Sequence, residues 1–215
     1  MAEFINTIDV LGDDAVIDSI INRTIAEFKD NVVTKIGEYA FYNCKTLKTV
    51  ELPNVGTVSA SYAFQGCTAL ERVNLPKFDA DNSNHIKGIF AGCKSLEEIS
   101  FPSLRKVGYQ MMEDCTALRK VDLGCADYIH QYAFNRTALD ILIIRTQSVC
   151  DVVNVHQGLG STPIWNGTGY IYVPRALVDS YKAATNWSTV ADQFRALEDY
   201  TVDGTITGEL DETKI

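Results

Sequence analysis

The 215-residue sequence lacks the features that mark a membrane protein or a nucleic-acid-binding protein. It has no run of about 20 consecutive apolar residues, so we expect no membrane-spanning helix. Lys and Arg total 19 against 28 Asp and Glu, and this acidic balance disfavours nucleic-acid binding, which needs a basic face. The start, residues 1–10, contains no basic region followed by an apolar stretch, so we also expect no secretory signal.

The sequence also lacks the paired ligands and oriented nucleophiles from which metal and catalytic sites are built. No two cysteines occur as C-x-x-C, and the three histidines (His85, His130 and His156) fall in separate parts of the chain. Cys150 and His156 are a conceivable nucleophile pair, but no third group in the sequence orients either one. We therefore expect no enzyme activity, no metal and no cofactor.

The sequence does contain a short motif that occurs five times. An aromatic or methionine residue is followed by cysteine, leucine, a β-branched residue and another apolar residue at fixed spacing. The first positions lie 23, 26, 22 and 22 residues apart, and a period in the low twenties indicates a solenoid of stacked coils. The copies are Phe41, Cys44, Leu47, Val50 and Leu52; Phe64, Cys67, Leu70, Val73 and Leu75; Phe90, Cys93, Leu96, Ile99 and Phe101; Met112, Cys115, Leu118, Val121 and Leu123; and Phe134, Leu139, Leu142 and Ile144, without the cysteine.

The spacing within this motif predicts the secondary structure of one coil. Its leucine, β-branched and apolar positions follow L-x-x-L-x-L, and the last two point to the same side of a strand. Proline ends that strand in three copies and Gly124 replaces it in the fourth. The aromatic end predicts a short helical turn, and the cysteines are expected to form a buried row of small apolar side chains instead of metal ligands or disulfides.

Residues beside the inward positions should form an outward surface. Arg72, Glu98 and Lys120 fall in one row across neighbouring strands and alternate in sign. One interpretation is a charge row that sets the strand register, and the other is a recognition surface. The next outward row lacks the aromatic residues of a sugar-binding platform.

The C-terminal segment 146–200 predicts an α/β cap. Residues 170–173 alternate like a last strand, residues 176–184 fit an amphipathic helix, and Ser188 is a candidate N-cap of a second helix that extends to Leu197. The fifth repeat strand carries Ile141 and Ile143 at outward positions, so either the cap or another subunit has to cover them. Both residues are therefore candidate partner-binding residues.

The remaining two segments are acidic. Residues 1–32 do not show the repeat and contain an isoleucine-rich stretch with Ile17, Ile20 and Ile21. This segment is either a cover for the first coil or a docking segment for a larger assembly, which makes the three isoleucines candidate partner-binding residues. Residues 201–215 form an acidic tail.

The repeated AF-x-x-C-x-x-L core resembles the BspA-type leucine-rich repeat over residues 33–145, although Met111 and Met112 replace the alanine and phenylalanine in the fourth copy. The resemblance implies a leucine-rich-repeat solenoid, mainly β with short helical turns. We expect about five coils between an N-terminal cover and the C-terminal cap.

The acidic start, with its Ile8 to Gly12 stretch ahead of the repeats, is similar to virion-associated repeat proteins of phages. This resemblance implies a bacteriophage virion component, a head fibre or a tail-associated protein. Its partners would be capsid or tail proteins and a host surface ligand, and homo-oligomerisation stays open. The alternative is an adhesion or interaction module on a bacterial cell surface.

Overall fold

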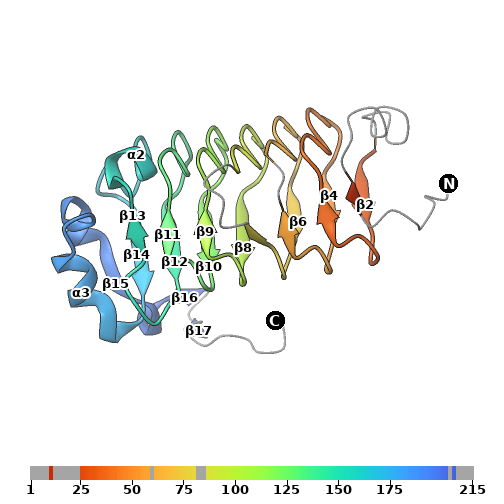
Figure 1. The fold of residues 1–215 in the computed structure, drawn as a ribbon. Helices are drawn as coiled ribbons and strands as arrows, with labels where there is room; N and C mark the ends of the chain where they lie inside the picture. Colours follow the sequence, from red (N-terminus) through yellow and green to blue (C-terminus); the bar gives the residue numbers. More distant parts are fainter. Residues whose placement is uncertain (1–9, 12–24, 59–60, 81–85, 203–204, 207–215) are drawn as a thin grey trace.

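The computed structural model describes residues 10–11, 25–58, 61–80, 86–202 and 205–206. These residues wind into a long stack of coils that ends in a small helical cap (Figure 1). Two rows of short parallel strands run along the stack. The long-strand row comprises β2 (Glu27–Lys29), β4 (Thr49–Glu51), β6 (Arg72–Asn74), β8 (Glu98–Phe101), β10 (Lys120–Leu123), β12 (Ile141–Ile144), β14 (Tyr170–Val173) and β15 (Phe194–Ala196). The short-strand row comprises β1 (Val10–Leu11), β3 (Lys35–Ile36), β5 (Thr57–Val58), β7 (Asp79–Ala80), β9 (Lys106–Val107), β11 (Tyr128–Ile129) and β13 (Asp151–Val152).

The register of the long-strand row confirms the predicted inward and outward positions. Val121 of β10 aligns with Ile99 of β8 and with Leu142 of β12, and all three side chains are buried. Lys120 aligns with Glu98 on the opposite side of the same strands. The period of two along each strand therefore separates a filled interior from an outward face.

The aromatic end of each coil is a hydrogen-bonded turn and not the helical turn that we predicted. Tyr39 and Asn43 have φ angles of 59° and 56°, which an α-helix does not allow. The N–H of Phe41 donates to the carbonyl of Ala63 in the next coil at 2.6 Å. The N–H groups of Tyr39, Phe41 and Asn43 thus bond to the next coil, whereas those of Tyr42 and Cys44 bond inside the turn.

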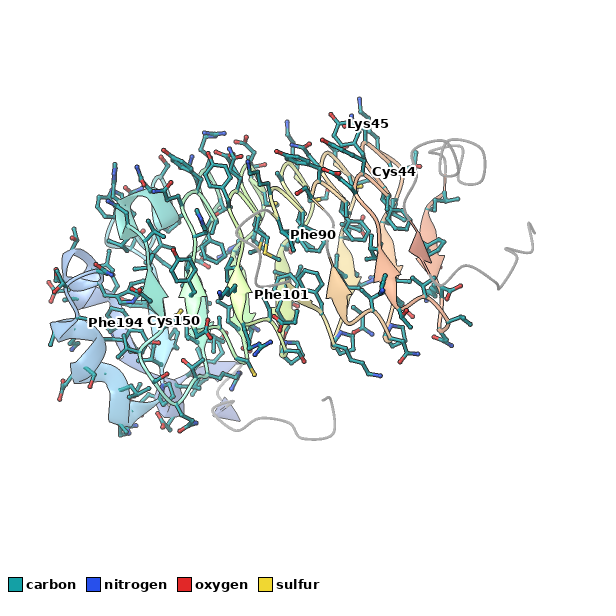
Figure 2. The ribbon with its side chains drawn as sticks, in the orientation of Figure 1. Cys44, Lys45, Phe90, Phe101, Cys150 and Phe194 are labelled. Atoms are coloured by element: carbon teal, nitrogen blue, oxygen red, sulfur yellow. The ribbon has the colours of Figure 1, made fainter. Side chains whose placement is uncertain are left out.

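Aromatic rings and cysteines fill the interior of the stack. The rings of Phe41, Phe64 and Phe90 stack in sequence, with centroids 4.9 Å and 5.2 Å apart. Figure 2 shows Phe90 and Phe101 inside the coils, and their centroids are 5.8 Å apart. The four repeat cysteines are buried, as the sequence predicted, and none of them is in a disulfide: Cys44, Cys67, Cys93 and Cys115.

The C-terminal cap extends the strand row and closes the end of the core. It contains α2 (Val155–Leu159), η1 (Arg175–Leu177), α3 (Val178–Ala183) and η2 (Ser188–Gln193). Trp187 and Tyr181 attach this cap to the last coil through Cys150: the indole N–H donates to the Cys150 carbonyl at 2.7 Å, and the Cys150 N–H donates to the Tyr181 hydroxyl at 2.8 Å. Cys150 and Phe194 are labelled in this region in Figure 2.

The second cap helix is shorter than we predicted from the sequence. The 3-10 helix η2 ends at Gln193, and residues 194–196 form β15, which pairs in parallel with β14. Trp187 and not Ser188 holds the N-cap position of η2. A strand is favoured here because its main chain pairs with β14 while Phe194 enters the core between Tyr181 and Trp187.

The chain itself covers the apolar outward positions of β12. After β15, η3 (Leu197–Asp199) places Leu197 and Tyr200 against Ile143, which is 1% exposed, while Ile141 packs at the edge of this cluster. The hairpin of β16 (Thr201–Val202) and β17 (Thr205–Ile206) follows. Ile143 is therefore unavailable to a partner in this arrangement, which corrects its assignment as a candidate partner-binding residue.

The strand rows begin earlier than the sequence repeat suggested. β2 pairs in parallel with β4, and Phe28 packs edge-on against Phe41 at 5.0 Å, although both β2 and Phe28 fall in the segment 1–32 that we set apart from the repeats. β1 also pairs with β3. Ile17, Ile20 and Ile21 lie outside the described residues.

Candidate functional site

The outward face, formed by the outward-pointing side chains of the long-strand row, contains all three residues of the predicted charge row. Lys120 and Glu98 form an ion pair with a Nζ–Oε2 distance of 3.5 Å. Arg72 instead donates to the hydroxyl of Thr49 at 3.5 Å. The alternating row is thus only partly formed, because the structure joins Glu98 to Lys120 but directs Arg72 toward the preceding coil.

The reason for this interruption is a break in the strand row between β6 and β8. Strands β2, β4 and β6 form one sheet, and β8 begins a second sheet that continues to β15. The short-strand row is interrupted at the same level, between β7 and β9, and also nearer the start of the stack, between β3 and β5. The two coils that meet here are the ones with the 26-residue spacing in the sequence.

Main-chain hydrogen bonds show where the ladder is lost. The carbonyls of Lys48, Glu97 and Arg119 each accept two N–H groups from the next coil at 2.8–3.2 Å. The carbonyl of Glu71 holds the same position in its coil, yet no main-chain bond joins residues 71–75 to residues 97–101, all of which the structure describes. The break therefore leaves main-chain donors and acceptors facing one another without a ladder partner.

A hollow of about 650 Å³ opens on the outward face over this break. We call it the junction hollow, and it is lined by residues of β4, β6, β8 and β10 together with Glu71, Ser95 and Glu97. Val73 at its floor is partly exposed, whereas the equivalent Val50 and Val121 are fully buried. The break thus exposes the edge of the core as well as the main chain.

Carboxylates outnumber cations around the junction hollow. Its lining contains five acids against two bases. Glu51 is paired with Lys29 at 2.8 Å, and the hydrogen bond from the ammonium to this carboxylate raises the pKa of Lys29. Asp122 accepts two hydrogen bonds from Arg145 at 2.8 Å, whereas exposed Glu71 and Glu97 form no ion pair with any described residue. The hollow is therefore electrostatically suited to a cationic group.

Side chains take over part of the coil-to-coil bonding beside the break. The hydroxyls of Ser95 and Ser103 donate to the carbonyls of Thr68 and Pro76, each at 2.8 Å. On the short-strand row, the Asp79 carboxylate accepts from both the main-chain N–H and the guanidinium of Arg105 at 3.0 Å and 2.8 Å. Together with main-chain bonds of the turns, such as that from the Phe64 N–H to the Ile89 carbonyl at 2.8 Å, these bonds join the two halves of the solenoid while the sheet remains open.

A tyrosine cluster lies at the other end of the outward face, and the sequence analysis missed it. Tyr170 and Tyr172 are the outward residues of β14, Tyr200 packs against Tyr172 at 4.7 Å, and the guanidinium of Arg195 lies 4.4 Å from the centre of the Tyr170 ring. Burial raises the pKa of Tyr172. The alternation of residues 170–173, which predicted the strand, also carried the signal that both tyrosines point outward.

The residues considered for catalysis do not form a site. Cys150 is buried, which raises the pKa of its thiol, and its main chain is bound by the cap. His156 packs on Trp165, and His130 lies among tyrosine rings. His85 lies outside the described residues, which contain no cluster of three or more metal-binding side chains.

Comparison with known proteins agrees with this architecture. A family model described as a BspA type leucine rich repeat region matches residues 19–140 in six copies, which is more than half of the chain. The chain belongs to the BspA-type leucine-rich repeat family. The match starts inside the segment 1–32, as does β2, and it points to no catalytic family. A search of curated protein sequences returns no match.

Three solved structures of leucine-rich repeat proteins are similar to this BspA-type chain. A leucine rich cell surface protein from Faecalibacterium prausnitzii is 20% identical with a TM-score of 0.50, over 86% of this chain and 44% of that protein. A Bacteroides ovatus protein is 20% identical (TM-score 0.36; 72% of this chain, 50% of that one), and a T. pallidum protein is 18% identical (TM-score 0.27; 49% and 69%). The chain spans less than half of the Faecalibacterium protein, and that likeness shows the fold alone. No helix in the described part of the chain has the length and apolarity to cross a bilayer.

Proposed function

We propose that this chain is a non-enzymatic binding module of a bacterial cell-surface protein and that it binds its partner on the outward face. The observation that carries the proposal is the junction hollow, which opens over β6 and β8 on a face whose opposite side is a filled apolar core. A rigid stack with one polar, indented face offers contact area and charge, which suits recognition better than chemistry.

Several features disfavour catalysis at this face. The junction hollow is open to solvent and lined mainly by hydrophilic side chains, whereas catalytic groups act best in a pocket that excludes water. Among the residues that the structure describes, neither Glu71 nor Glu97 has a hydrogen-bonded partner of the kind that would tune a general acid or base. Binding requires no such arrangement.

The cell-surface part of the proposal is supported by the description of the Faecalibacterium protein. It corresponds to the alternative that we drew from the sequence. The phage virion hypothesis stays a prediction, because neither the family match nor the three structures named above supports it.

The location of the protein in its own host tests this proposal. Intact cells of the bacterium that encodes the chain are treated with a protease, and the chain is followed with an antibody to the repeats. We expect loss of the signal from intact cells, while a cytoplasmic marker protein survives. Recovery of the chain only in phage particles separated on a density gradient would support the virion hypothesis instead.

A further inference from the structure

The coil-to-coil step at the junction hollow differs from its two neighbours in the main-chain hydrogen bonds of the long-strand row. In the steps on either side, N–H groups of each coil donate to carbonyls of the one before, as Arg72 does to Lys48 at 3.0 Å and Lys120 does to Glu97 at 3.2 Å. At the break, the equivalent N–H of Glu98 and carbonyl of Glu71 are not bonded to each other. By the same register, the N–H and carbonyl of Val73 also face the break without a ladder partner.

Charge placement gives a physical reason why the break stays open. Glu71 and Glu97 occupy equivalent positions in adjacent coils, as do Lys48 and Arg119 in the coils beyond them. Like charges directly across neighbouring strands are destabilising, and both carboxylates here are exposed without a described ion-pair partner. A positive charge placed between them would remove this repulsion.

The acceptor groups around the break determine which chemical group of a ligand fits there. A lysine ammonium or an arginine guanidinium has only donors, so it can satisfy carbonyl oxygens and carboxylates together. The carbonyl of Glu71 and the carboxylates of Glu71 and Glu97 offer that set at one place. An anion would meet the acidic excess of the lining and is disfavoured.

The size of the hollow favours an extended peptide segment over a free ion as its ligand. Its volume of about 650 Å³ is much larger than one ammonium group, and it extends across β4, β6, β8 and β10. Asn74, Ser95 and Ser100 add neutral hydrogen-bonding side chains along it. Such a groove can accept the main chain of an extended segment while one long side chain enters the break.

We propose that the junction hollow binds an extended, basic segment of a partner protein and that a lysine or arginine side chain of this segment occupies the break between β6 and β8. This inference rests on the proposed function and names the chemistry of its partner. The segment lies across the outward face, and its cation lies between Glu71 and Glu97.

The test uses a fluorescein-labelled peptide of alternating glycine and lysine, with a glycine–glutamate peptide as the charge-reversed probe. Binding to the full chain is measured by fluorescence anisotropy at low and at physiological salt. The double variant Glu71→Gln/Glu97→Gln removes both carboxylates beside the break. The matched control, Glu38→Gln/Asp179→Asn, removes two exposed carboxylates elsewhere.

We expect the lysine peptide to bind the natural chain and the control variant with the same affinity. It should bind the double variant about fivefold to tenfold more weakly, because each exposed ion pair contributes only modestly to the binding free energy. Equal binding to all three proteins would show that the peptide binds by general charge and would overturn the inference. Tighter binding of spermine than of the peptide would also overturn it, because the site would then take a free cation.

Hydrogen exchange provides a second test that does not depend on the probe. The amides of Val73 and Ser100 should exchange faster than the ladder amides of neighbouring strands, and the lysine peptide should slow them. Full protection of both amides in the free chain would mean that the ladder is closed and would overturn the inference. Failure in either test leaves the protease experiment on intact cells unaffected, so the proposed function is judged separately.

Discussion

The thiol of Cys93 donates a hydrogen bond to the main-chain carbonyl of Phe64, 3.2 Å away and one coil earlier. The same bond joins Cys67 to Phe41 and Cys115 to Phe90, each at 3.0 Å. The repeat cysteine is therefore more than a small apolar side chain, because its thiol adds a second donor to a buried carbonyl: the Phe64 carbonyl also accepts the N–H of Cys67 in its own turn at 3.2 Å. The thiol donor and the buried sulfur together give a physical reason for a cysteine at this position of the repeat.

The first prediction concerns this bond. Replacing Cys93 by alanine removes the donor and a buried sulfur, and should lower the free energy of unfolding by about 1–2 kcal/mol. Urea denaturation measures the change. The exposed Cys125 provides the control, since Cys125→Ala should leave the midpoint unchanged. An unchanged midpoint for Cys93→Ala would contradict the role assigned to the thiol.

The reactivity of the thiols should follow burial. Burial raises the pKa of Cys67, Cys93 and Cys150, and only a thiolate reacts quickly with a disulfide reagent. We expect one of the six thiols, that of the exposed Cys125, to react in the native protein and all six to react after denaturation. The Cys125→Ser variant should show no rapid native reaction, and a second fast thiol in that variant would show that the core opens.

The residues that cover β12 should be needed to keep the chain from associating with itself. Leu197 is 5% exposed and packs with Tyr200 on Ile143. Leu197→Ala should cost about 2–3 kcal/mol of unfolding free energy, as for other buried leucines, and should expose Ile143. Sedimentation velocity should then detect self-association. Val153→Ala, which changes a side chain that is 37% exposed, should do neither.

The ion pair of Asp122 and Arg145 should respond differently to single and double substitution. The two side chains are only 18% and 12% exposed, so Asp122→Ala leaves an almost buried guanidinium without its partner and should cost about 3 kcal/mol. The double change Asp122→Ala/Arg145→Met should cost less than Asp122→Ala alone. Asp199→Ala breaks the exposed pair with Arg175 and should leave the free energy of unfolding almost unchanged.

Stability should depend on His130 below neutral pH. Burial lowers the pKa of His130 in the folded chain, and its Nδ1 accepts the N–H of Gln131 at 2.8 Å. The unfolded chain therefore binds a proton first, so stability should fall as the pH drops through about 6.5 toward the lower folded pKa. Thermal melts at pH 7.5 and 5.5 should show a smaller loss for His130→Gln than for the natural chain. Equal losses would mean that His130 does not contribute.

Much of the coil could be predicted because it depends on residues close together in sequence. The two-residue interval between Val121 and Leu123 places both side chains inward whatever the neighbouring coils do. The same parity placed Arg72, Glu98 and Lys120 outward. The turns were less predictable, because left-handed residues such as Tyr39 are stabilised by bonds to the next coil, which a single copy of the repeat does not reveal.

The end of the cap and the contacts of the outward tyrosines also could not be predicted from local sequence. Residues 194–196 follow a helix and read as its continuation, yet they become β15 because the open edge of β14 is available to them. Tyr170 and Tyr172 were recognised as strand residues, but their contact with Tyr200 depends on how the chain returns after β15.

The amino-acid sequence alone determined that the chain forms a stacked leucine-rich-repeat solenoid with buried cysteines and a charged outward face, because these properties follow from spacing within each coil. Only the tertiary structure decided that the strand row breaks between β6 and β8 and that Leu197 and Tyr200 cover Ile143. Both features arise where separate coils, or a coil and the segment after the cap, meet, and there the result depends on competition between hydrogen bonds, like charges and apolar contacts.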